Sequence, residues 1–128
     1  PEQIKILFFQ PLELLLGGER FGILLGKGEF HPALAGIKHL NRLEQVLARL
    51  EWSDPQIAEG LMSDQKGRII EGISTNLFLV SGGRLLTPEI GNCGVTGVMR
   101  GYILEVAAQE LGLQIAEVHC ERALVAAA

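Results

Sequence analysis

Lys38, Glu71 and the turn at residues 94–97 are the parts of this sequence that could do chemistry together. A lysine amine forms a reversible imine with an aldehyde, and a carboxylate can keep a pyridine nitrogen protonated. The turn reads Gly-Val-Thr-Gly and precedes a predicted helix, where unpaired backbone N–H groups attract phosphate. Together the three features could hold an aldehyde cofactor by its carbonyl, its ring nitrogen and its phosphate. The set therefore predicts pyridoxal 5′-phosphate.

Lys38 and Glu71 each also have an ordinary structural explanation. Lys38 lies between Gly36 and a predicted helix in mostly apolar company, which favours imine chemistry, but a surface lysine near a helix start would look the same. Glu71 follows two isoleucines and precedes a loop of small polar residues, so it could face a pyridinium or be a solvent-exposed acid at a strand end. Only their combination with the turn favours the cofactor.

The polar residues around these two positions are equally open to two interpretations. Ser74 and Thr75 could bind phosphate, or they could be turn residues that bond their own backbone. Thr96 could be an ordinary helix N-cap after a glycine loop. Arg42 and Arg100 could reach anionic groups, although solvated helix faces explain both of them.

A helix over residues 41–52 must position Lys38. Its apolar residues recur at helical spacing, and charged residues occupy the other face. Asn41 is a plausible N-cap, and Glu44 three positions later could complete a capping box. Lys38 would then lie just outside the helix start.

Short strands and turns account for most of the remaining sequence. Two hairpins are predicted, one over residues 58–62 and 69–70 with a turn at 64–67, and one over residues 77–80 and 84–86. A helix should run from residue 97 to the stop signal at Gly112. Further strands are expected at residues 4–9, 12–16, 21–25 and 113–118, and a last helix begins at residue 121 with nothing visible to pack it. The expected sheet is antiparallel.

Composition limits the class of protein. The chain has 128 residues with 48% hydrophobic and 20% charged residues, which is typical of one globular domain. A net charge of −4 and a pI near 5.3 argue against nucleic-acid or anionic-membrane partners. Cys93, Cys120 and the three histidines have no disulfide-framework or metal-ligand spacing, so we expect structural roles, no metal and a reducing cytoplasm.

Three segments resemble the fold-type IV pyridoxal-phosphate enzymes, which include branched-chain and D-amino acid aminotransferases and aminodeoxychorismate lyases. They are residues 34–47 (LAGIKHLNRLEQVL), residues 71–78 (EGISTNLF) and residues 94–96 (GVT). The first segment looks most like the lyases, whereas the other two are shared by the class. The resemblance covers roughly residues 31–124.

The resemblance implies a role for each matching residue. Lys38 would form the imine with the cofactor aldehyde and be the catalytic residue, and Glu71 would contact the pyridine nitrogen. Ser74 and the backbone amides of the turn would contribute to phosphate binding. The expected cofactor-binding residues are Lys38, Glu71, Ser74, Thr75, Val95 and Thr96.

The resemblance also implies a fold, an assembly and a reaction. The fold would be an α/β (α+β) large domain like that of D-amino acid aminotransferase, with a mostly antiparallel sheet and packed helices, in a homodimer. The reaction would convert 4-amino-4-deoxychorismate to 4-aminobenzoate and pyruvate, a step toward folate. A branched-chain or D-amino acid aminotransferase is the alternative enzyme, and a truncated, non-catalytic domain is the second alternative.

Family members are considerably longer than this chain. They have a small N-terminal domain before the matching region and further strands after it. Residues 1–128 are therefore expected to be part of a pyridoxal-phosphate-binding large domain, without that small domain and those C-terminal strands.

Overall fold

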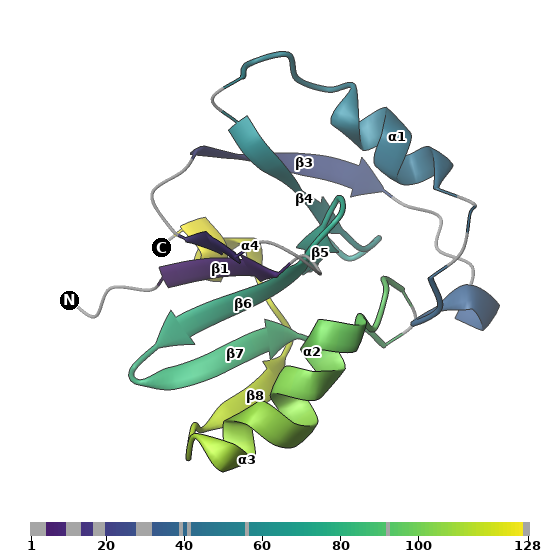
Figure 1. The fold of residues 1–128 in the computed structure, drawn as a ribbon. Coiled ribbons are helices and arrows are strands. Elements are labelled where there is room, and N and C mark those ends of the chain that lie inside the picture. The colour runs from purple at the N-terminus through teal and green to yellow at the C-terminus, as the bar shows by residue number, and fades with distance from the viewer. Residues whose placement is uncertain are drawn as a thin grey trace.

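The computed structural model of the chain describes residues 5–9, 14–16, 20–27, 32–38, 40, 42–55, 57–91 and 93–126. Two β-sheets form the scaffold (Figure 1). The larger sheet has the strand order β2-β1-β6-β7-β8, and the smaller has the order β3-β4-β5. In the larger sheet the strands are β1 (Lys5–Phe9), β2 (Leu14–Leu16), β6 (Asn76–Ser81), β7 (Arg84–Pro88) and β8 (Ile115–Val118). In the smaller they are β3 (Arg20–Lys27), β4 (Ile57–Ser63) and β5 (Ile69–Gly72).

Both predicted hairpins are present, because their turns are encoded locally. The turn between β4 and β5 contains Gly67, and the turn between β6 and β7 contains Gly82 and Gly83. Most strand pairs are antiparallel, as the sequence predicts. Two pairs of the described strands are parallel, however: β3 with β4, and β7 with β8. A parallel pair needs a long crossover connection between its strands, and both crossovers here carry predicted site residues.

The crossover from β3 to β4 contains the short 3₁₀ helix η1 (Pro32–Leu34), Lys38 and the helix α1 (Leu43–Arg49). This helix is shorter than the predicted span of residues 41–52. Its N-cap is Arg42, whose side chain makes no capping hydrogen bond, so the predicted capping box with Glu44 is wrong; Asn41 lies outside the described residues. Of the helix residues only Ala48 is buried, and most of the predicted apolar face is exposed.

The crossover from β7 to β8 contains the turn at residues 94–97 and a continuous helical stretch. This stretch is α2 (Val98–Tyr102), a π-helical turn η2 (Ile103–Ala107) and α3 (Ala108–Glu110). The sequence predicts a plain helix here, and the π turn departs from it. The stretch ends just before Gly112, as expected. In Figure 1 it lies beside β7 and β8, whereas α1 lies beside β3 and β4.

The core lies between the sheets and the last helix, α4 (Arg122–Ala126). One cluster of buried residues takes Val125 from this helix, which corrects the expectation that nothing packs the C-terminal segment. Its members are Leu61, Ile69, Leu77, Leu79, Cys120 and Val125. A second cluster, Ala48, Met62 and Ile73 with Trp52 against it, packs α1 onto β4. Among the described residues, no helix is both long and apolar enough to cross a membrane.

Candidate active site

A cavity of about 300 Å³ lies where the two crossovers meet the connection from β5 to β6. Among the described residues, those that line it come from three stretches of the chain that are distant in sequence. They are Lys38 and Arg42; residues 71–76; and Val95 with residues 97–99. The structure therefore brings Lys38, Glu71, Ser74, Thr75 and Val95 to one cavity, as the sequence predicts.

The two crossovers are joined directly beside this cavity. The Gly36 N–H donates to the Gly94 carbonyl oxygen at 2.9 Å, and the Thr96 N–H donates to the Gly36 carbonyl oxygen at 3.1 Å. These bonds make an isolated parallel bridge between Gly36 and Val95. The lysine-bearing connection is thereby held against the turn that precedes α2.

Glu71 is a buried acid in β5, with 3% of its surface exposed. The four residues of this strand are all buried, so its side chain is shielded from bulk water. Its Oε2 accepts a hydrogen bond from the Val95 N–H at 2.9 Å. Its Oε1 is buried without a hydrogen-bond partner among the described residues. The alternative of a solvent-exposed strand-end acid is therefore wrong.

Burial raises the pKa of the Glu71 carboxyl from 4.5 to about 7, because desolvation disfavours its charged form. The Val95 N–H and the charge of Arg42 oppose this rise, and the charge of Glu59 adds to it. A buried acid with a raised pKa and a carboxyl oxygen that lacks a hydrogen-bond partner is typical of a functional site.

In the described part of the chain, two cationic side chains line the same cavity. Lys38 is exposed to solvent there, and Arg42 is half-buried. The Arg42 Nη2 donates to the Ile73 carbonyl oxygen at 2.9 Å, which ties the start of α1 to the segment after β5. The expectation of a solvated helix face is therefore wrong for Arg42.

The hydroxyls of Ser74 and Thr75 reach across to another strand, in contrast to the local turn bonds that the sequence left open as an alternative. Both donate to Oε2 of Glu59 in β4, at 3.1 and 3.0 Å. Sequence reasoning missed Glu59, which is 5% exposed. A signal was available, because an acid inside the otherwise apolar run of residues 57–62 must be exposed or paired.

The two backbone amides that were expected to bind phosphate both donate to protein oxygens. The Val95 N–H binds Glu71 and the Thr96 N–H binds Gly36. Thr96 is exposed and is not the N-cap of α2; that position is Gly97, with φ of +73° and no side-chain cap. The first N–H groups of α2 have no partner within the helix, and Val98 and Met99 line the cavity.

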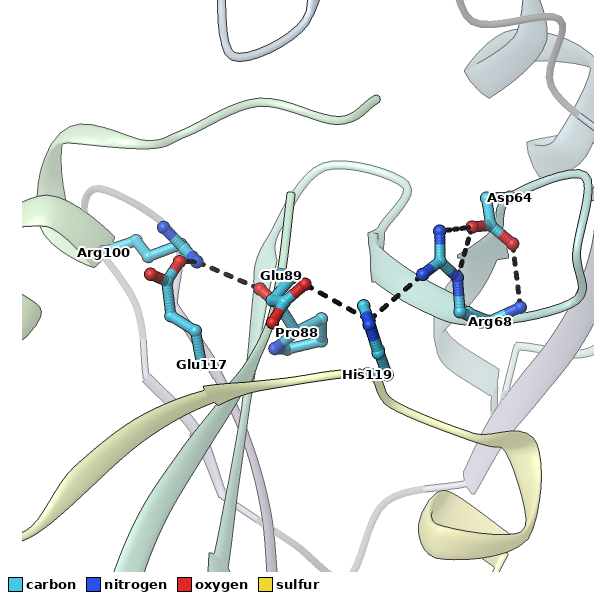
Figure 2. Close-up of polar contacts among 7 residues, drawn as sticks. All are labelled: Asp64, Arg68, Pro88, Glu89, Arg100, Glu117 and His119. Atoms are coloured by element: carbon cyan, nitrogen blue, oxygen red, sulfur yellow. Dashed lines mark hydrogen bonds and ion pairs between the residues drawn. The ribbon is translucent and has the colours of Figure 1, made fainter. Parts of the chain in front are cut away.

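Arg100 fixes the start of α2 to the larger sheet (Figure 2). It is 4% exposed, and its Nη2 donates to the Pro88 carbonyl oxygen at 3.0 Å and to the carboxylate of Glu117 in β8. The expectation of a solvated helix face is therefore wrong for Arg100 too. By holding the first turn of α2 in place, Arg100 also positions the cavity wall formed by residues 97–99.

The remaining contacts in Figure 2 form a polar network outside the cavity. His119 Nδ1 lies 3.2 Å from the Glu89 carboxylate and 3.0 Å from Nη1 of Arg68, which pairs with Asp64. His31 and His39 lie outside the described residues. Within the described part of the chain, no three His, Cys, Asp or Glu residues are grouped so that they could hold a metal ion.

Cys93 is a buried loop residue near the cavity turn. Burial raises the pKa of its thiol to about 11, and burial does the same for Cys120. A thiol with so high a pKa is a poor nucleophile at neutral pH, in agreement with the interpretation of Cys93 as a loop residue.

Comparison with known proteins places this site in a described family. The model of the family "amino-transferase class IV" matches residues 28–128. The chain is 37% identical to an aminodeoxychorismate lyase of Vibrio harveyi over 115 residues, which is 86% of this chain and 42% of that protein. It also resembles the crystal structure of 4-amino-4-deoxychorismate lyase from Pseudomonas aeruginosa, with a TM-score of 0.69 and 48% identity, over 82% of this chain and 40% of that one.

A branched-chain amino acid aminotransferase from T.th., solved with pyridoxamine 5′-phosphate, is a more distant match. Its TM-score is 0.58 at 28% identity, and the match covers 65% of this chain and 27% of that one. The chain therefore spans about two fifths of the length of the two lyases and less of the aminotransferase.

Proposed function

The chain belongs to the class IV aminotransferase family, and on this premise we propose that the protein is a pyridoxal-phosphate-dependent lyase. The proposed reaction converts 4-amino-4-deoxychorismate to 4-aminobenzoate and pyruvate, a step toward folate. The observation that carries the proposal is the cavity shared by Lys38 and Glu71, in which a buried carboxyl oxygen has no partner among the described residues. The similarity to two lyases favours this reaction over others in the family.

The residues around the cavity fit the cofactor. The unpartnered Oε1 of Glu71 would accept a hydrogen bond from a protonated ring nitrogen, which would satisfy a buried polar atom. The Lys38 amine would bond the aldehyde carbon, and the first N–H groups of α2 would bind the phosphate. Ser74 would contribute to phosphate binding only by turning its hydroxyl proton away from Glu59, to which it donates in the ligand-free protein. When bound, the cofactor supplies an electron sink for the electrons left behind as a substrate proton departs.

The protein's own part in the reaction is proton transfer and charge placement. Lys38, released by the incoming substrate amine, would remove the adjacent ring proton as a general base and later protonate the departing enol. Glu71, as a carboxylate, would hold the ring nitrogen positive. Lys38 and Arg42 would favour an anionic ligand in the cavity.

The first alternative is a branched-chain or D-amino acid aminotransferase, which would use the same residues. The similarity to an aminotransferase solved with pyridoxamine 5′-phosphate supports this alternative. In that case Lys38 would return the proton it removes, and no leaving group would depart. The second alternative is a domain without catalytic activity. With either enzyme we propose a homodimer in the cytoplasm, which sedimentation and fractionation would test.

Reduction with borohydride tests the proposal, because it fixes an imine to the lysine that forms it. After incubation with pyridoxal 5′-phosphate and reduction, peptide mass spectrometry should find the adduct on Lys38. Lys38→Ala should abolish the adduct, whereas Lys66→Ala, which changes an exposed lysine in the β4–β5 turn, should retain it. Modification of other lysines alone would refute the proposed site.

Two assays with different substrates distinguish the lyase from the aminotransferase. With 4-amino-4-deoxychorismate the wild-type protein should release 4-aminobenzoate, and Lys38→Ala should not. Transfer of an amino group from an amino acid to a 2-oxo acid, without 4-aminobenzoate formation, would support the aminotransferase instead. Trapping on Lys38 without either reaction would support the non-catalytic alternative.

A further inference from the structure

Val95 is a single bridge residue, and the backbone on one side of it is bonded to Gly36. The Gly36 N–H donates to the Gly94 carbonyl oxygen at 2.9 Å, and the Thr96 N–H donates to the Gly36 carbonyl oxygen at 3.1 Å. In a strand-like segment these flanking groups point to one edge, whereas the N–H and carbonyl of the bridge residue itself point to the opposite edge. Both backbone groups of Val95 therefore face away from the lysine-bearing connection.

Two side chains supply the partners on that opposite edge. Oε2 of Glu71 accepts from the Val95 N–H, and Nδ2 of Asn76 donates to the Val95 carbonyl oxygen, each at 2.9 Å. Glu71 lies in β5 and Asn76 is the first residue of β6, so the turn between these strands places an acceptor beside a donor. Together the two side chains pair with Val95 as one residue of a neighbouring strand would.

The Asn76 amide has one orientation in which it can make this bond. A carbonyl oxygen accepts only from a donor, so the amide nitrogen must face Val95. The amide oxygen then lies against Gly97, where a Cβ would be 1.9 Å from Oδ1. Gly97, with φ of +73°, thus leaves the space that the amide occupies. Asn76 is half-buried and lines the same cavity as Glu71.

We propose that Asn76 is a positioning residue that holds the Val95 N–H on Oε2 of Glu71 and so leaves Oε1 to accept from the ring nitrogen of the cofactor. Without the Asn76 bond, the Val95 peptide would be free to turn about its bridge to Gly36 as about a hinge. Glu71 would then lose the hydrogen bond that fixes its Oε2. The inference rests on the proposed function, because it assigns Oε1 to a ring nitrogen.

Charged and titratable groups of other elements lie around the Glu71 carboxyl. They are Arg42, Glu59, Cys93, Arg100 and, on the cavity wall, Lys38. The charges of Arg42 and Arg100 lower the pKa of Glu71, and the charge of Glu59 raises it. Replacing Asn76 by an apolar residue changes none of these groups. A change in the Glu71 pKa would therefore report the hydrogen bond from Val95, which favours the charged carboxylate.

Asn76→Leu tests the inference without any ligand, because leucine has nearly the shape of asparagine and no donor. Carbon-13 NMR of the Glu71 carboxyl, assigned by the loss of its signal in Glu71→Gln, measures the pKa in the ligand-free protein. That pKa is about 7 in the wild type. It should rise by about 1 pH unit in Asn76→Leu, since loss of a hydrogen bond to the carboxylate disfavours the charged form.

The matched control is Gln109→Leu, which removes an exposed amide in α3 and should leave the Glu71 pKa unchanged. If Asn76→Leu does not fold, Asn76→Ala removes the same donor without adding an apolar branch and should also raise the pKa. An unchanged or lowered Glu71 pKa in the folded variant would overturn the inference, whatever ligands bind.

Two aldehydes then test the connection to the ring nitrogen. Pyridoxal 5′-phosphate and its deaza analogue, in which a C–H group replaces the ring nitrogen, both form an imine with lysine. Only the first can donate from its ring to Glu71. Imine absorbance measured against aldehyde concentration gives both affinities for each variant. Asn76→Leu should weaken binding of pyridoxal 5′-phosphate about tenfold and leave binding of the analogue nearly unchanged, and Gln109→Leu should alter neither affinity.

The two measurements keep this inference separate from the proposed function. If the wild type binds neither aldehyde, the proposed function fails, and a raised Glu71 pKa in Asn76→Leu would still support positioning of Glu71 by Asn76. If the wild type binds both, equal weakening of the two aldehydes in Asn76→Leu, or weakening of neither, would overturn the proposal.

Discussion

Replacing Glu71 by glutamine should remove a large pH dependence from the stability of the ligand-free protein. Burial raises the pKa of the Glu71 carboxyl from 4.5 to about 7. A shift of about 2.5 pH units corresponds to about 3 kcal/mol of unfolding free energy, at about 1.4 kcal/mol per unit. Because only 3% of Glu71 is exposed, solvent screening reduces this figure little.

The sign of the effect follows from which state holds the proton. Between pH 4.5 and about 7 the folded protein keeps the proton on Glu71, while the unfolded chain has released it. The unfolded state then binds fewer protons, so the free energy of unfolding falls as pH rises. The contribution of Glu71 is fully present below pH 4.5 and is lost as pH rises through about 7.

Urea unfolding at about pH 4.5 and about pH 8 measures this difference. From the lower to the higher pH, the wild type should lose about 3 kcal/mol more stability than Glu71→Gln does. Other titrating groups are common to both proteins and cancel in the comparison. Glu110→Gln, the exposed control, should behave like the wild type. If the wild type and Glu71→Gln lose the same unfolding free energy between the two pH values, the carboxyl at this position is not desolvated, and the reasoning is refuted.

Three other predictions concern the surroundings of the cavity. Gly97→Ala should lower the unfolding free energy by about 1–3 kcal/mol, because φ is +73° and the new Cβ would lie 1.9 Å from Asn76 Oδ1; urea titration measures the loss. Arg100→Met should cost about 1–3 kcal/mol in the same assay by leaving the buried Pro88 carbonyl oxygen unpaired. Cys93 and Cys120, with pKa values near 11, should react slowly with iodoacetamide at about pH 8 and rapidly in urea. Fast labelling of the native protein would contradict their burial.

The sequence predicts this site well where the signals are local. The two hairpins follow from their turn residues, and Lys38, Glu71 and the glycine turn could be singled out because each lies at the end of a predicted element. The π turn within residues 98–110 has no comparable signal, since its residues have the same apolar spacing as an α-helix.

The wrong or missed predictions for Arg100 and Glu59 have one physical cause. The hydrogen-bond partners of each residue are distant in the chain. Arg100 can be buried because Glu117 and the Pro88 carbonyl oxygen accept its hydrogen bonds. Glu59 can be buried because the hydroxyls of Ser74 and Thr75 donate hydrogen bonds to it. No local pattern contains those pairings. A charged residue on a predicted helix face is usually solvated, so local reasoning favours the wrong environment for Arg100.

The parallel strand pairs explain why such distant residues meet at one cavity. Each parallel pair obliges the chain to cross over, and the two crossovers come together at Gly36 and Val95. Val95 then connects three parts of the site, since its N–H donates to Glu71 and its carbonyl oxygen accepts from Asn76 Nδ2 at 2.9 Å. The acid in β5, the turn before α2 and the start of β6 are therefore held by a single residue's backbone. Because backbone groups make these bonds, the geometry between Glu71 and the turn depends on the path of the chain at Val95 more than on its side chain.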